Sequence, residues 1–104
     1  MATMDELKKH MEKCVAYYRN RVSPELVQSE AETIAELMLE SGDVTLRFLE
    51  ACTQEEYELC ALGFLNCAYK WGMPFVVHLE NLADQKGWTD ILTDMIGEAR
   101  AEVE

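Results

Sequence analysis

Histidine and cysteine are the residues best suited to catalysis or metal binding, and this chain holds two histidines and four cysteines. His10 and Cys14 are four residues apart, so on a helix they share one face and can contact the same metal ion. A zinc site needs three or four ligands, however, and no further ligand stands near this pair in the sequence. We interpret the two residues as an ordinary, partly buried pair and expect no metal.

Cys60 and Cys67 also share a helical face, but they are too far apart to bond within one helix. Seven residues of helix rise about 10.5 Å, whereas a disulfide requires Cα atoms within about 7 Å. Cys14 and Cys52 complete the set, and all four cysteines lie in apolar helical patterns without C-x-x-C spacing. We therefore expect four reduced, mostly buried thiols in a cytosolic protein.

The sequence contains no motif that is typical of an enzyme. Neither His10 nor His78 follows a glutamate by three residues, which argues against the Glu-x-x-His pairs of di-iron bundles. The phosphate-binding patterns G-x-x-x-x-G-K and G-x-G-x-x-G and the nucleophile pattern G-x-S-x-G do not occur either. The prediction is a protein without catalytic residues, cofactor or metal, and hence not an enzyme.

Carboxylates are the most abundant reactive groups, with 20 Asp and Glu against 9 Lys and Arg, for a formal charge of −11. They are concentrated after Val22, where two helical rows repeat every four residues. The rows are Glu32, Glu36 and Glu40, and Asp90, Asp94, Glu98 and Glu102. Like charges four apart cost a helix roughly 0.2 to 0.5 kcal/mol per pair. The cost favours an interface, although a solvated face that maintains solubility is the alternative.

The sign of the charge limits the partners. A strongly negative surface repels nucleic acid and anionic lipid, because both carry negative charge, and it accelerates encounters with basic proteins. We therefore predict that the seven carboxylates of the two rows bind a basic protein, with no direct binding to nucleic acid or membrane. The N-terminus is polar, and no apolar run approaches the roughly 20 residues of a membrane span, so we expect a cytoplasmic protein.

Helix caps and apolar spacing predict the elements that carry these side chains. Expected helices run from about 4 to 21, 24 to 41, 44 to 52, 54 to 71, 74 to 86 and 90 to the end. Thr3, Ser23, Asp43, Thr53 and Thr89 are the expected N-caps. The last helix is expected to bury Ile91, Leu92, Met95, Ile96, Ala99 and Val103.

The helices lead to an all-α fold, because no strand pair or hairpin turn is present. Short connections favour five or six antiparallel helices in a compact bundle or a short superhelix of helical hairpins. With 104 residues, the chain is expected to form a single helical domain, 1–104. The predicted core contains Ile34, Tyr57, Cys60, Phe64, Leu65, Leu79, Leu82, Met95 and Ile96.

A resemblance to a known family rests on a run of cap and apolar positions. The run comprises Leu39-Glu40-Ser41-Gly42-Asp43, Leu46, Phe48-Leu49, Thr53-Gln54-Glu55-Glu56, Phe64 and Glu80-Asn81-Leu82-Ala83. It resembles small all-helical bacterial immunity proteins, including those paired with contact-dependent growth inhibition toxins. The resemblance implies a cytosolic toxin inhibitor, or antitoxin, that binds and neutralises a cognate toxin domain, such as a basic nuclease, through its acidic surface.

A helical adaptor or scaffold is the alternative function. Such a protein presents an apolar groove to a helix of its partner. Trp71, Trp88, Phe75 and Tyr69 are the candidate groove residues, although aromatic residues at helical spacing more often belong to the core. Ionic strength separates the two functions, because a charge-steered inhibitor loses association rate with salt and a groove binder loses little.

Overall fold

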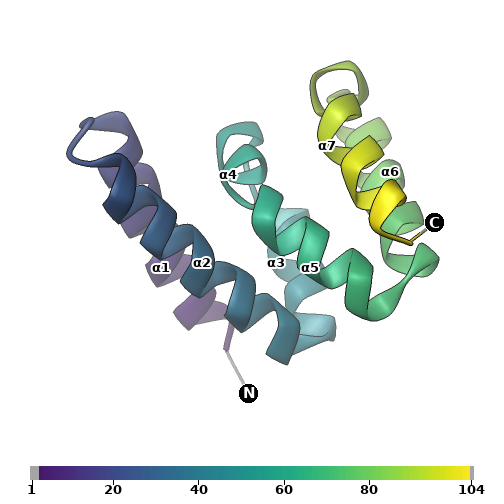
Figure 1. Ribbon diagram of the computed structural model, residues 1–104, viewed down its shortest axis with the longest axis horizontal. Coiled ribbons are helices and arrows are strands. Elements are labelled where there is room, and N and C mark those ends of the chain that lie inside the picture. The colour runs from purple at the N-terminus through teal and green to yellow at the C-terminus, as the bar shows by residue number, and fades with distance from the viewer. Residues whose placement is uncertain (1–2, 104) are drawn as a thin grey trace. The chain divides into compact units, whose positions relative to one another are not determined.

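The computed structural model of the chain describes residues 3–103, and at position 91 it describes the backbone alone. These residues contain seven helices and no strand (Figure 1). The helices are α1 (Met4–Arg19), α2 (Pro24–Ser41), α3 (Asp43–Ala51), α4 (Gln54–Leu59), α5 (Ala61–Trp71), α6 (Met73–Lys86) and α7 (Thr89–Val103). The predicted all-α class is confirmed, whereas the predicted number of five or six helices is too low.

The additional helix arises because the predicted 54–71 helix is interrupted at Cys60. This residue has φ −88° and ψ 6°, far from the ψ of about −42° in an α-helix. Its N–H bonds to two carbonyl groups, those of Glu56 at 3.2 Å and Tyr57 at 3.1 Å. The apolar spacing continues through the interruption, since α4 and α5 both bury side chains next to it, so periodicity alone predicts one helix.

Three of the expected N-caps form as predicted, and the first is Thr3, whose hydroxyl accepts the N–H of Glu6 at 3.2 Å. The Thr53 hydroxyl accepts the N–H of Glu56 at 3.2 Å, and the Glu56 carboxylate accepts the N–H of Thr53 at 2.9 Å. This reciprocal pair is a complete capping box. Ser23 accepts the N–H of Glu25 at 3.2 Å, directly before Pro24 at the first helical position.

Two other caps were predicted one residue too late. Gly42, with φ +50°, is both the C-cap of α2 and the N-cap of α3, so Asp43 is already helical. A positive φ at glycine turns the chain without an intervening linker and leaves no separate position for a cap. Likewise, α7 begins at Thr89 itself, and the carbonyl of Trp88 accepts the first helical bond, from Leu92 at 3.0 Å.

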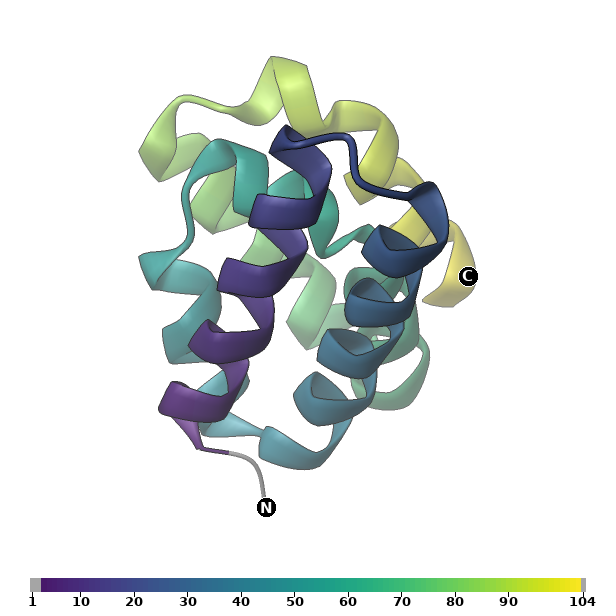
Figure 2. The same cartoon turned by 90° about the vertical axis from the view of Figure 1, so that its left-hand side faces the viewer.

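The chain divides into two compact units, and the division falls inside α5, after Gly63. In the first unit, α1 and α2 run side by side in opposite directions (Figures 1 and 2), and α1 also contacts α3 and α4. The buried apolar side chains of this unit are Leu7, Met11, Cys14, Ile34, Ala35, Met38, Phe48, Leu49, Cys52, Tyr57 and Cys60.

The second unit contains the rest of α5 together with α6 and α7, which pack against each other. Gly87, in the left-handed conformation with φ +73°, ends α6 and starts the return into α7. The buried side chains are Phe64, Cys67, Ala68, Phe75, Val76, Leu79, Leu82, Ala83, Leu92, Ile96 and Ala99. Of the predicted core, Leu65 and Met95 are only half-buried, as is Val103 in the predicted stripe of α7. The side chain of Ile91 lies outside the described residues.

Candidate functional site

The seven predicted partner-binding carboxylates are exposed. On α2 they are Glu32, Glu36 and Glu40, which we call the α2 row. On α7 they are Asp90, Asp94, Glu98 and Glu102, the α7 row. The four-residue spacing advances each side chain by only about 40° around the helix, which keeps each row on one face. The rows belong to different units, so each is a separate candidate surface.

No carboxylate of either row forms an ion pair within residues 3–103. Among these residues, ion pairs join Arg19 to Glu55 and Arg100 to Glu80, and the His10 ring contacts the Glu30 carboxylate. One row member has a hydrogen-bond donor, since Gln28 Nε2 donates to Glu32 Oε1 at 3.2 Å. The repulsion within each row is therefore relieved by solvent and dissolved ions rather than by a lysine or arginine of the described chain.

His10 and Cys14 both use α2 for their polar contacts. His10 Nδ1 lies 2.8 Å from Glu30 Oε2, and the Cys14 thiol donates to the carbonyl of Val27 at 3.7 Å. Elsewhere in the described part of the chain, too, no three His, Cys, Asp or Glu side chains are arranged to hold a metal ion. The pair thus links α1 to α2 in the first unit.

All four cysteines are free and buried, which confirms the predicted burial. Burial raises the pKa of the Cys67 thiol to about 12, although the nearby Lys70 acts in the opposite direction. The pKa of Cys60 is raised well above its usual value by a hydrogen bond with Cys52 and by burial. Burial and, to a smaller extent, Glu30 raise the pKa of Cys14. A raised thiol pKa lowers the amount of reactive thiolate, so none of these three is suited to nucleophilic catalysis at neutral pH.

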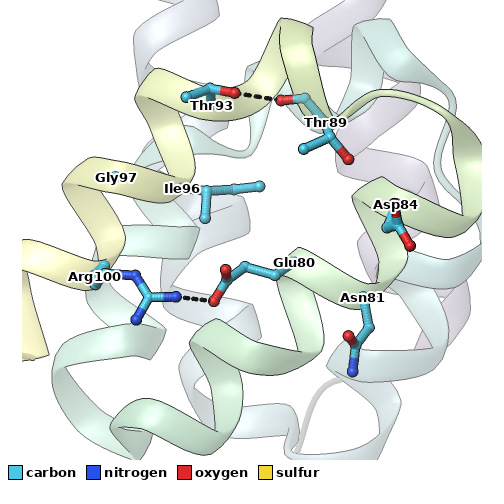
Figure 3. Close-up of a pocket in the computed structure, with 8 residues that line it drawn as sticks. All are labelled: Glu80, Asn81, Asp84, Thr89, Thr93, Ile96, Gly97 and Arg100. Carbon is cyan, nitrogen blue, oxygen red and sulfur yellow. Dashed lines mark hydrogen bonds and ion pairs between the residues drawn. The ribbon is translucent and has the colours of Figure 1, made fainter.

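The second unit holds a groove between α6 and α7, which sequence reasoning missed (Figure 3). It has a volume of about 470 Å³, within the range of about 300 to 1,000 Å³ for ligand pockets. We call it the α6–α7 groove. It is lined by Glu80, Asn81 and Asp84 from α6, Thr89 at the start of α7, and Thr93, Ile96, Gly97 and Arg100 from α7. Small residues repeating every four positions, at Thr89, Thr93 and Gly97, were the available sequence signal.

The polar groups of the groove differ in their partners. Arg100 Nη2 forms an ion pair with Glu80, and Arg100 Nη1 lies 3.7 Å from the sulfur of Met73. The Thr93 hydroxyl donates to the carbonyl of Thr89 at 2.6 Å. Asp84, by contrast, is exposed, and its carboxylate forms no ion pair with any residue between 3 and 103. The groove therefore holds one carboxylate that Arg100 neutralises, that of Glu80, and one that can pair with a bound cation, that of Asp84.

The four aromatic residues predicted for an adaptor groove do not share one environment. Phe75 is buried and meets Trp71 edge-on, with ring centroids 5.5 Å apart. The Lys86 ammonium lies 4.8 Å from the ring centre of Trp88, a cation–π contact. Only Tyr69, among these four, is strongly exposed, at 77%. Neighbouring side chains thus cover three of the four rings at least in part.

Exposed apolar side chains instead occur around the turn between α1 and α2. Tyr18, Val22 and Leu26 are 52%, 56% and 43% exposed, and they lie at the end of α1, in the turn and in the first helical turns of α2. Arg21 in this turn has φ +51°, a left-handed conformation that is rare for a residue with a Cβ atom. We call these three apolar side chains the turn patch.

Comparison of the chain with protein-family models, with curated proteins and with solved structures finds no match. Within the described residues, none of the helices has both the length and the apolar character that crossing a lipid bilayer requires. The function must therefore be argued from the surfaces themselves.

Proposed function

We propose that this chain is an inhibitory binding protein of the immunity type, which neutralises a basic toxin domain in the cytoplasm. The observation that carries the proposal is the exposure of seven carboxylates in two rows, none of them in an ion pair with a described residue. Maintaining such rows opposes helix stability, because each like-charge pair is repulsive. A basic partner relieves this repulsion when it binds, so the relief adds to the binding free energy.

A nuclease is the toxin class that fits this surface best. Its active site must attract phosphate and therefore carries positive charge, which an acidic helix face complements without imitating the substrate. Long-range attraction of this kind raises association rates by about 10- to 1,000-fold at low salt. Inhibition by occupation of the active site requires no catalytic group on the inhibitor.

The proposal is tested by neutralising each row separately. In one variant Asp94 and Glu98 are replaced by Gln, and in the other Glu36 and Glu40 are replaced by Gln. The matched control carries Glu50→Gln and Glu58→Gln, which remove the same charge from exposed sites outside the rows. Each protein is co-expressed with a basic nuclease toxin domain as the candidate partner, and cell survival is measured together with the association rate of the purified pair.

We expect at least one row variant to reduce the association rate by about tenfold at low salt, with a smaller effect of the control. Equal association rates and equal survival for both row variants, the control and the original chain would refute the proposal.

An adaptor that binds its partner through apolar contacts is the second candidate, and the turn patch is the observation that favours it. Tyrosine is one of the residue types that supply much of the binding energy at the centre of interfaces, and Tyr18 belongs to this patch. Under this alternative, Tyr18→Ser weakens partner binding at every ionic strength, whereas the row variants have no effect. Adding Tyr18→Ser to the row variants and their control therefore separates the two candidate functions.

A further inference from the structure

Gly97 has no structural requirement to be glycine. It lies in the middle of α7, its φ is not positive, and a Cβ atom added to it would meet nothing within 4 Å. Glycine in the middle of a helix is unfavourable, because it loses more conformational freedom on folding than other residues do. Its position in the wall of the α6–α7 groove offers a reason, since it allows another molecule to approach the backbone of α7 closely.

The groove combines an apolar wall with a carboxylate rim. The side chain of Ile96 extends between the two helices (Figure 3), and next to it Gly97 exposes backbone. Asp84 is the available carboxylate at the rim, because Arg100 already neutralises Glu80. A ligand that matches these features has an apolar stem and a positively charged head.

We infer that the α6–α7 groove receives an arginine side chain of the basic partner, with its methylene groups against Ile96 and Gly97 and its guanidinium on Asp84. Arginine fits better than lysine, because its planar head carries five donors in a fork that can bond to both oxygen atoms of Asp84 at once. An anion is disfavoured, since the groove carries two carboxylates against one guanidinium. The inference rests on the proposed function, from which the basic partner is taken. It places one arginine of that partner in the α6–α7 groove.

The test uses the whole chain, labelled with ¹⁵N, and a blocked Gly-Arg-Gly peptide as the probe. A Gly-citrulline-Gly peptide is the matched probe, because citrulline has nearly the shape of arginine without its charge. We expect saturable shifts of the amide signals of Thr89, Thr93 and Gly97 with the arginine peptide, and about two- to fivefold weaker binding of the citrulline peptide, because it lacks the charge that pairs with Asp84.

Two variants locate the contact. Gly97→Leu fills the groove and favours the helix, so we expect a folded protein in which saturable binding is lost. Asp84→Asn should weaken peptide binding about two- to fivefold, the range for an exposed ion pair. The controls are Ala16→Leu and Glu58→Gln, which introduce the same leucine side chain or remove the same charge at exposed sites of the first unit, and both should bind as the original chain does.

Undiminished binding to Gly97→Leu, or equal binding of the two peptides, would overturn the inference. These outcomes are independent of the row experiment. Arginine binding in the groove together with unchanged toxin association of the row variants supports the inference and refutes the proposed function. Loss of toxin association in the row variants without arginine binding in the groove supports the proposed function and refutes the inference.

Discussion

Two helical glycines, Gly63 and Gly97, allow the packing of this protein to be tested with the same chemical change. A Cβ atom at Gly97 would lie in open space, whereas one at Gly63 would lie 2.5 Å from the sulfur of Met38 and 3.0 Å from its terminal methyl group. Met38 is completely buried, so its side chain has little room to withdraw. Replacing each glycine by alanine therefore isolates the effect of the neighbouring side chain.

The expected magnitudes follow from this geometry. In the middle of a helix, Gly→Ala is worth about 0.5 to 1 kcal/mol, so Gly97→Ala should stabilise the chain by that amount. Gly63 lies in the first turn of α5, where the gain is at most as large, and forcing a methyl group into a filled core costs about 1 to 3 kcal/mol. Gly63→Ala should therefore range from nearly neutral to destabilising by about 3 kcal/mol.

The assay is urea and thermal unfolding followed by circular dichroism. For a domain of this size each kcal/mol corresponds to roughly 4 to 8 °C, so the melting temperatures of the two variants should differ by at least about 4 °C. Shortening Met38 to Ala should cost about 2 to 5 kcal/mol in the original chain and less in the Gly63→Ala background, where the new methyl group fills part of the space. Equal stabilisation by Gly63→Ala and Gly97→Ala would refute the packing argument.

Three further predictions concern charge, pH and backbone conformation. Replacing Asp94 and Glu98 by Gln removes three repulsive pairs of the α7 row and should raise the unfolding free energy by about 0.6 to 1.5 kcal/mol at low salt, and a gain that persists undiminished in high salt would contradict this. The pKa of the Cys67 thiol is about 12 in the folded chain and 9.0 ordinarily, so between pH 9.0 and about 12 only the unfolded chain loses the thiol proton. Stability should therefore fall as pH rises above about 9, by at most about 1.4 kcal/mol per pH unit for this group, and urea titrations should show a shallower fall for Cys67→Ala. Arg21→Gly should relieve the left-handed backbone and raise the melting temperature by the equivalent of about 0.5 to 1 kcal/mol, whereas Arg21→Ala, which keeps a Cβ atom, should not.

The helices and most of their ends were predictable, because they depend on groups close together in the chain. The capping box of Thr53 and Glu56 needs only residues three apart, and the glycine turns at Gly42 and Gly87 need only a residue that tolerates positive φ. The exposure of both carboxylate rows also follows from helical periodicity, since each row lies opposite an apolar stripe. These features required no knowledge of which helices meet.

The features that sequence alone did not reveal depend on contacts between helices. The apolar spacing of 54–71 is continuous, yet the chain interrupts it at Cys60, directly before Gly63 approaches Met38 and the backbone of Ala35 on α2. Leu65 and Met95 have the spacing of core residues but remain half-buried, because periodicity defines a face and not how completely a neighbour covers it.

The α6–α7 groove illustrates the same limit for function. Its members lie between positions 80 and 100 of the sequence, and only the packing of α6 against α7 brings Glu80 to Arg100 and leaves Asp84 without an ion-pair partner within residues 3–103. Sequence determined the helices and the charge on their exposed faces, because both are local properties of the chain. Tertiary structure decided which carboxylate is neutralised and where a cavity remains, because both depend on how side chains from different helices fit together.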